Sequence, residues 1–192
     1  MKVSQRFILL FSAMAAMGLT VICGCASAGG SGQVGGEKTF RVRYRPEEAK
    51  VTQHLEATAS ETWSVLGAAF QDLGYKGGPS ASAAEHLYMT PTLRVTGRLY
   101  EGEWNSAYLD CGRTPDGRPA VESYELYFAV LVWVDADKPS GSTVRILVDG
   151  WGNDRAHATV DVRCGGTGRL EAGFLQAIQR RLKLSAKSND GT

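Results

Sequence analysis

The sequence predicts an α+β fold, in which a curved antiparallel sheet packs against two helices, preceded by a signal peptide and a flexible tether. Apolar stripes with helical spacing occur near both ends of the folded part, and alternating apolar residues typical of strands fill the region between them. Strands joined by short turns, with helices outside the run, are typical of the α+β class. The predicted segments are a signal peptide (1–24), a cysteine followed by a Gly/Ser-rich tether (25–37), a single domain (38–184) and a disordered tail (185–192).

The first strand and the first helix are predicted from residues 51–74. Apolar and polar residues alternate over 51–57, which indicates a strand. Thr58 lies three residues before Glu61, and this spacing is typical of a capping box that opens a helix. Gly74 is the expected C-terminal cap. The apolar stripe of this helix consists of Trp63, Leu66, Phe70 and Leu73.

A less regular region follows over residues 87–119. Its first part, 87–95, reads as an extended segment in which Pro91 indicates an edge position or a bulge. The second part, from Gly97 to Pro119, is a long polar loop, and long loops on rigid scaffolds often carry function. Its candidate contacts with a partner are Tyr100, Trp104 and Tyr108. We expect these rings to be tucked back over the sheet; the alternative is that they are offered to a partner.

The clearest strand pattern covers residues 124–134, where every second residue is apolar. A turn is predicted at 135–141, and 143–149 returns as the antiparallel partner. The second face of this hairpin region carries four further candidates, Tyr127, Leu131, Trp133 and Trp151. We expect these side chains to pack against the C-terminal helix. The alternative is that they line a cavity for a small apolar ligand between the sheet and that helix.

A last strand is predicted at 160–164, followed by a glycine-rich turn and a second helix. The apolar stripe of this helix consists of Leu170, Phe174, Ile178 and Leu182. The turn resembles a dinucleotide-binding fingerprint only in its first glycines, because Glu171 stands in place of the third. We therefore predict a capped turn and no cofactor.

The N-terminus has the layout of an export signal, with Lys2 and Arg6 in front of an apolar run over residues 7–22. The end of this run, Val21-Ile22-Cys23-Gly24-Cys25, resembles the cleavage and lipidation box of bacterial lipoproteins. The resemblance implies that Cys25 becomes the lipidated first residue of the mature protein. Two or more acyl chains on this residue would anchor it stably to a membrane.

The residues after Cys25 bear on the final location. Ala26 in this position implies sorting to the outer membrane, with the domain facing the periplasm. One alternative is ordinary cleavage after Ala28, which would give a secreted or periplasmic protein. The other is an uncleaved membrane anchor.

Cys111 and Cys164 are the cysteines of the predicted domain, and exported proteins occupy compartments where disulfides persist. We predict that they form a disulfide, for which the chain-entropy model gives roughly 4 kcal/mol of stabilisation. The alternatives are free or redox-active thiols and a metal site. Two cysteines without a nearby histidine pair make a poor zinc site, so no metal is predicted.

Two sequence elements resemble those of a family of bacterial lipoproteins with a leader, a short tether and one domain. They are Asp110-Cys111-Gly112 and Cys164 followed by Thr167-Gly168-Arg169-Leu170-Glu171. The resemblance covers most of the mature chain and implies a helix-grip-like arrangement, in which a curved sheet wraps the C-terminal helix. A more distant architectural likeness is to the lipoprotein subunits of the outer-membrane β-barrel assembly machinery. Fold alone does not give function.

The charge balance excludes one class of partner. The chain has 21 basic and 20 acidic residues; removal of residues 1–24 takes away Lys2 and Arg6 and no acid, which leaves 19 and 20. A nearly neutral protein lacks the basic surface of a nucleic-acid binder. No nucleic-acid partner is therefore predicted.

No catalytic motif accompanies the three histidines or the acidic residues. We therefore expect a lipid-anchored, non-catalytic protein of the cell envelope that acts as a periplasm-facing interaction module for another envelope protein. The alternative is a carrier or sensor of a small apolar ligand, and an enzyme ranks third.

Overall fold

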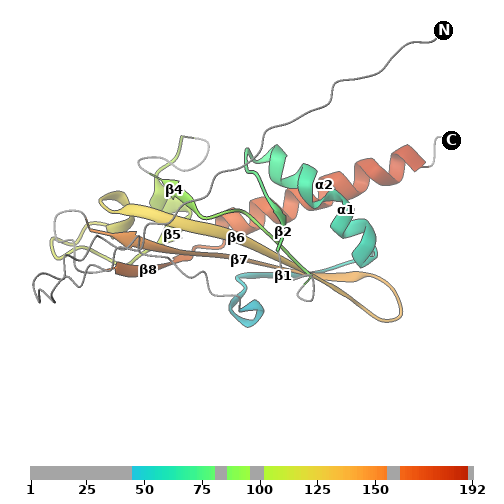
Figure 1. The fold of residues 1–192 in the computed structure, drawn as a ribbon, viewed down its shortest axis with the longest axis horizontal. Coiled ribbons are helices and arrows are strands. Elements are labelled where there is room, and N and C mark those ends of the chain that lie inside the picture. Colours follow the sequence, from blue (N-terminus) through green and yellow to red (C-terminus); the bar gives the residue numbers. More distant parts are fainter. Residues whose placement is uncertain (1–44, 81–85, 96–101, 155–160, 190–192) are drawn as a thin grey trace, which may run out of the picture. The chain divides into compact units, whose positions relative to one another are not determined.

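The computed structural model describes residues 45–80, 86–95, 102–154 and 161–189. The predicted signal peptide, the tether with Cys25 and the candidate contact Tyr100 lie outside the described residues. Contacts divide the chain between Lys38 and Thr39, and everything described below belongs to the second part. As predicted, this part has an α+β fold, with an open antiparallel sheet and two helices on the same side of it (Figure 1).

The described residues form an eight-stranded sheet with the order β2-β3-β6-β7-β8-β5, in which β1 also pairs with β7 and β4 with β6. The elements are η1 (Pro46–Glu48), β1 (Val51–Leu55), α1 (Ala59–Asp72), β2 (Gly78–Pro79), β3 (Leu87–Met89), β4 (Leu93–Val95), η3 (Asn105–Ala107), β5 (Leu109–Asp110), η4 (Ala120–Glu122), β6 (Glu125–Ala136), β7 (Ser142–Asn153), β8 (Asp161–Gly166) and α2 (Arg169–Asn189).

The centre of the sheet is the long hairpin of β6 and β7. It is paired from Glu125 and Asn153 at the open end to Ala136 and Ser142 beside the turn. Gly141 in the turn has a φ of 103°. A Cβ atom there would lie 2.7 Å from the carbonyl oxygen of Leu55 in β1. Glycine is therefore required both by its backbone conformation and by the close approach of β1.

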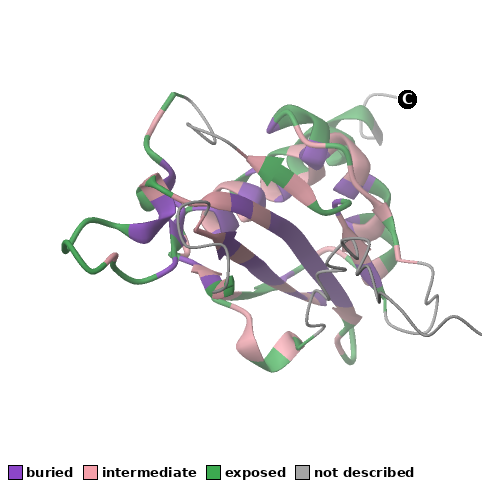
Figure 2. Ribbon diagram, turned by 60° about the vertical axis from the view of Figure 1, so that its left-hand side comes forward, coloured by how far each residue is buried: buried purple, intermediate pink, exposed green. Residues whose placement is uncertain are grey.

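The two faces of this hairpin belong to different clusters, and both strands are almost continuously buried (Figure 2). The face that packs against the helices consists of Leu126, Phe128, Val130, Val132, Val134, Val144, Ile146 and Val148. The rings of Phe70 in α1 and Phe174 in α2 lie 4.6 Å apart, so the two helices meet above this face. On the opposite face, Ala129, Leu131, Trp133 and Leu147 of the hairpin form a smaller cluster with Leu87 of β3.

The predicted start and end of α1 are confirmed. The Thr58 side chain accepts a hydrogen bond from the Glu61 amide, and the Glu61 carboxylate accepts one from the Thr58 amide at 2.8 Å. Leu66 and Phe70 of the predicted stripe are fully buried. Gly74 follows the helix with a φ of 77°, the left-handed conformation expected of a glycine cap.

The second helix is longer than predicted. It continues to Asn189, so the prediction of a disordered tail is wrong for residues 185–189. In this stretch Ala186 and Lys187 favour helix even where nothing packs on them. Arg181 of α2 forms an ion pair with Asp72 at the end of α1, with Nε and Oδ2 2.7 Å apart. None of the described helices is long and apolar enough to cross a membrane.

The predicted extended segment 87–95 is divided into β3 and β4, which pair with different parts of β6. Between them lies Thr90, which is buried. Its amide donates to the Val130 carbonyl at 3.1 Å, and its hydroxyl accepts from the Val130 amide at 3.1 Å. The Thr90 side chain thus takes the place of a backbone carbonyl where Pro91 interrupts the strand.

Candidate functional site

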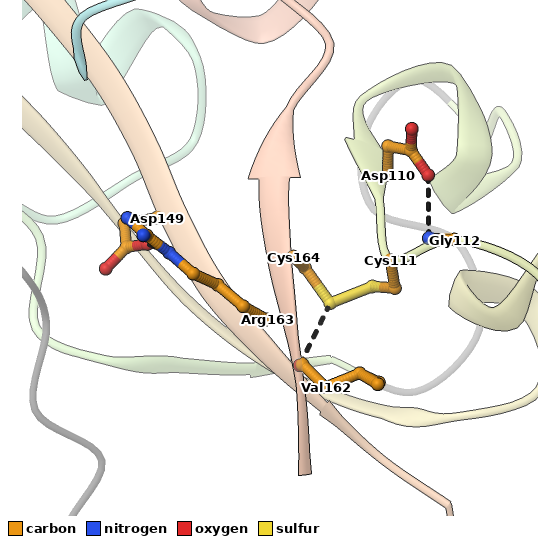
Figure 3. The surroundings of a disulfide bond; sticks show 7 residues. All are labelled: Asp110, Cys111, Gly112, Asp149, Val162, Arg163 and Cys164. Carbon is orange, nitrogen blue, oxygen red and sulfur yellow. Dashed lines mark hydrogen bonds and ion pairs between the residues drawn. A yellow bond between two sulfur atoms is a disulfide. The ribbon is translucent and has the colours of Figure 1, made fainter.

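Residues 102–123 connect β4 to β6 and form a lobe that we call the disulfide lobe. Its strand β5 pairs with β8 through Leu109 opposite Gly166 and Asp110 opposite Gly165. Directly after β5, Cys111 is bonded to Cys164, with the two Cα atoms 4.2 Å apart (Figure 3). The predicted disulfide is therefore present, and it fastens the lobe to β8.

The two sequence elements that carry the lipoprotein resemblance meet at this point. In the first element, Asp110 Oδ1 accepts a hydrogen bond from the Gly112 amide at 2.8 Å, and Gly112 has a φ of 77°. This turn lets the chain change direction immediately after Cys111. The second element supplies Cys164 and the start of α2. Together the elements build one junction of a strand pair, a disulfide and a helix N-terminus.

Glu171 completes this junction as a buried carboxylate with 0% exposure. Its Oε1 accepts from the Val148 amide at 3.3 Å, and its Oε2 accepts from the Gly168 amide at 3.1 Å. Along β7, the pairing with β1 ends at Ile146 and the pairing with β8 begins at Asp149. Val148 therefore has a partner residue in neither of these two strands. Burial raises the pKa of the Glu171 carboxyl, while hydrogen bonds from backbone amides act in the opposite direction.

Tyr108 fixes the inner side of the disulfide lobe, with only 2% exposure. The guanidinium carbon of Arg169 lies 5.3 Å from the centre of the Tyr108 ring. Arg169 also forms an ion pair with Glu103, with Nη1 and Oε2 2.6 Å apart. Thr167 donates from its amide to the Tyr108 carbonyl at 3.0 Å and from its hydroxyl to the Ala107 carbonyl at 2.8 Å. The start of α2 therefore holds this part of the lobe from several directions.

Trp104 lies on the outside of the same lobe, and 58% of the residue is exposed to solvent. It directly precedes η3, in which the Ser106 amide donates to the Glu122 carboxylate at 2.8 Å. Asn105, the next residue, is buried. Trp104 is thus an exposed ring between anchored neighbours, whereas Tyr108 is tucked in. The structure separates two candidates that the sequence placed together.

The tip of the disulfide lobe, around residues 113–119, is held by its own polar contacts. The Arg113 guanidinium donates to the Gly117 carbonyl at 2.6 Å, and the Thr114 amide donates to the Arg118 carbonyl at 2.9 Å. Hydrogen bonds from Thr114 and Arg118 lower the pKa of the Asp116 carboxyl. The tip is therefore a folded turn, although most of its residues are exposed.

The four candidates on the second face of the hairpin do not face the C-terminal helix, which corrects that prediction. Leu131 and Trp133 are buried in the cluster on the side of the sheet opposite α1 and α2. Tyr127 and Trp151 are paired across the strands and are partly buried. Alternation along β6 turns its even-numbered residues towards the helices. Phe174, Ala177 and Ile178 of α2 are each 0% exposed and belong to the core on that side.

A histidine and a carboxylate that are far apart in sequence form a pair beside the hairpin turn. His54 Nδ1 and Asp137 Oδ2 are 2.6 Å apart, and the Thr143 hydroxyl donates to the same oxygen at 2.8 Å. Hydrogen bonds from Thr143 and His54 lower the pKa of Asp137. The contacts join β1 to the β6–β7 turn, which is a structural role. Within the described ranges, no group of three or more Cys, His, Asp or Glu residues could hold a metal ion.

A charged cluster on the other side of β8 was not predicted. Arg163 lies between the buried Asp149, with Nε and Oδ1 3.1 Å apart, and Glu48 of η1, with Nη2 and Oε2 2.6 Å apart. Figure 3 shows that Arg163 and Cys164 leave β8 on opposite sides. The partners of Arg163 are 14 and 115 residues away in sequence, so no local sequence motif predicts these ion pairs. For Glu171 a signal existed, because it stands three residues after Gly168, at the spacing of a helix cap.

No known protein family, curated protein or solved structure matches this chain. The fold and the lobe define its class on their own: an α+β domain with an open antiparallel sheet, two helices on one face and a disulfide-fastened lobe. Chemically, the lobe presents one large ring on an ordered surface, which suits recognition of another molecule.

Proposed function

We propose that the mature chain is a lipid-anchored protein of the bacterial cell envelope that acts as a non-catalytic, periplasm-facing interaction module. Its contact with a protein partner is centred on Trp104 of the disulfide lobe. The observation that carries this proposal is the 58% exposure of Trp104 on a segment whose neighbours are held in place. Trp is enriched among the residues that dominate interface energies.

The surroundings of Trp104 support a docking role in two ways. The residue before it, Glu103, is paired with Arg169, and Ser106 is bound to Glu122. Ordered neighbours reduce the conformational entropy that is lost when a surface docks. A hollow of about 500 Å³ beside the ring is lined by Gly102, Glu103, Trp104, Ser106 and Ala107. A partner side chain that enters this hollow would contact the indole directly.

The proposed location rests on the N-terminal sequence. The apolar run that ends at Cys25 supports lipidation, and Ala26 supports the outer membrane. The disulfide between Cys111 and Cys164 is consistent with an oxidising compartment. If the chain is instead cut after Ala28, the same module would work in the periplasm or outside the cell.

The experiment is site-specific photocrosslinking in intact cells. A photoreactive phenylalanine analogue replaces Trp104 in one variant and Leu184 in another, because these side chains have nearly equal exposures of 58% and 59%. We expect a discrete crosslinked protein from position 104 and none from position 184. The same partner, once identified, should lose binding to the Trp104→Ala protein in a purified pair.

The variant at position 184 distinguishes a specific interface from nonspecific crosslinking of exposed side chains. Equal crosslinking from both positions would show that any exposed apolar residue captures neighbours, and it would overturn the proposal. Crosslinking at 184 alone would move the interface to α2. Unchanged partner affinity of the Trp104→Ala protein would also exclude Trp104 as the anchor.

A further inference from the structure

A cavity of about 590 Å³ lies between the N-terminal turn of α1 and the edge of the sheet at β2 and β3. Volumes of about 300–1,000 Å³ are usual for small-molecule sites. The helix contributes Ala59, Ser60 and Trp63, and the sheet side contributes Pro79, His86 and Leu87. Ser60, Pro79 and His86 are exposed, so the cavity opens to solvent on their side.

The aromatic wall of this cavity is held in position before any ligand arrives. The ring centres of Trp63 and Tyr88 are 5.8 Å apart, with the planes at 82°. Tyr88 also packs against Phe70 at 4.9 Å and donates its hydroxyl hydrogen bond to the Gly77 carbonyl at 3.1 Å. These contacts connect the Trp63 ring to the core. A ligand that stacks on Trp63 would therefore meet an ordered surface.

Backbone hydrogen bonds hold the described residues that border the cavity. His86 adopts a φ of 46°, which is uncommon for a residue other than glycine. Its carbonyl accepts a hydrogen bond from the Val134 amide at 3.2 Å, and the Ser80 amide donates to the Leu87 carbonyl at 2.8 Å. His86, with its left-handed backbone conformation, therefore directly precedes β3 beside the cavity mouth.

The described lining residues indicate the charge and polarity of a ligand that would fit the cavity. Among the described residues that line it there is no Asp, Glu, Lys or Arg, and His86 is the only titratable one. None of these described residues carries a fixed charge that would compensate the desolvation of an ionised ligand. Ala59, Trp63 and Pro79 offer accessible apolar surface, whereas the Ser60 hydroxyl and the His86 imidazole offer hydrogen bonds at the mouth.

We propose that this cavity binds a small neutral amphiphile, with an apolar ring or short chain against Trp63 and a single hydrogen-bonding end towards Ser60 and His86. This site is separate from the sheet–α2 interface suggested by the sequence. It is also separate from the disulfide lobe, because β5 and β8 lie at the opposite end of the sheet from the start of α1 (Figure 1). The inference does not rest on the partner contact at Trp104.

Dye binding tests the site on the mature chain, made with Cys25→Ser so that no lipid is attached. The probe is N-phenyl-1-naphthylamine, a neutral apolar fluorophore, and its charged counterpart is 1-anilinonaphthalene-8-sulfonate. We expect saturable binding of the neutral dye and affinity at least about tenfold weaker for the sulfonate. Absence of saturable binding, or equal affinity for the two dyes, would refute the proposed ligand class.

Two tryptophan variants on the same helix localise the binding. Ser60→Trp places an indole at the cavity mouth and should weaken binding of the neutral dye at least about tenfold. Gln71→Trp, three turns later on an exposed position outside the lining, is the matched control and should bind as the parent does. Thermal melting of both variants checks folding. Retained binding in a folded Ser60→Trp protein would exclude this cavity, and Trp104→Ala should leave dye binding unchanged.

Discussion

The two aromatic residues of the disulfide lobe contribute in different ways, although only four positions separate them in the sequence. Tyr108 is buried beneath Arg169, whereas Trp104 is mostly exposed. Their substitution by alanine should therefore give opposite results in assays of stability and of binding.

For Tyr108→Ala we expect a loss of about 3 kcal/mol in the free energy of unfolding, because a buried ring is removed. For Trp104→Ala we expect a change within about 0.5 kcal/mol, as is usual for surface positions, together with loss of partner binding. Urea unfolding of both variants provides the comparison. A large loss of stability in Trp104→Ala would assign that ring a structural role instead.

Glu171 makes stability depend on pH in a defined direction. Its pKa is raised above the ordinary value of 4.5 in the folded state, so ionisation costs more in the folded chain than in the unfolded one. The contribution of this group to stability is therefore greatest below 4.5, and it decreases as pH rises from 4.5 through the folded pKa.

The variant Glu171→Gln cannot ionise and should lack this component. Unfolding curves of wild type and variant, measured between about pH 4 and pH 8, should show the variant gaining stability relative to wild type as pH rises. The comparison with wild type cancels the opposite effect of carboxylates such as Asp72, whose pKa is lowered by Arg181. A difference that does not change with pH would show that Glu171 titrates normally.

At the scale of secondary-structure elements, the junction of β5, β8 and α2 depends on a glycine. A Cβ atom on Gly166 would lie 1.8 Å from Glu171 Oε1, whereas one on the adjacent Gly165 would meet nothing within 4 Å. We expect Gly166→Ala to lower the free energy of unfolding by about 2–4 kcal/mol and Gly165→Ala to change it by less than about 1 kcal/mol. Equal effects in denaturant titrations would mean that Glu171 moves aside freely.

The disulfide has its own test at this scale. The bridge spans 53 residues, and replacing both cysteines by alanine should cost roughly 4 kcal/mol by the chain-entropy model. In the purified wild-type protein, alkylation without reductant should leave both cysteines unmodified, as measured by mass spectrometry. Two freely alkylated thiols would contradict the bridge.

At the scale of the whole molecule, attachment to the membrane should depend on one residue. We expect Cys25→Ser to abolish lipidation and processing at this position, so that envelope fractionation no longer finds a mature, membrane-bound protein. The glycine- and serine-rich tether behind Cys25 would reach roughly 20 Å, which allows the domain to work clear of the membrane surface. Unchanged processing and membrane binding in the variant would exclude the lipoprotein interpretation.

The elements that sequence analysis predicted well are those whose signals are local. The capping box of Thr58 and Glu61, the stripe of α1 and the β6–β7 hairpin all depend on residues within a few positions of one another. The end of α2 was misjudged because the polar composition after Ser185 is compatible both with a tail and with a solvated helix. Strand β5 was missed because two residues in a loop carry no periodic signal.

By itself, the sequence determined the α+β class and predicted the pairing of Cys111 with Cys164, both of which the structure shows. The tertiary structure alone decided which ring is displayed, which face of the hairpin meets the helices and where an open cavity remains. The physical reason is that local spacing fixes which residues share a face of a helix or strand. Burial instead depends on contacts such as that of Glu171 with Val148, which form only when distant segments pack together.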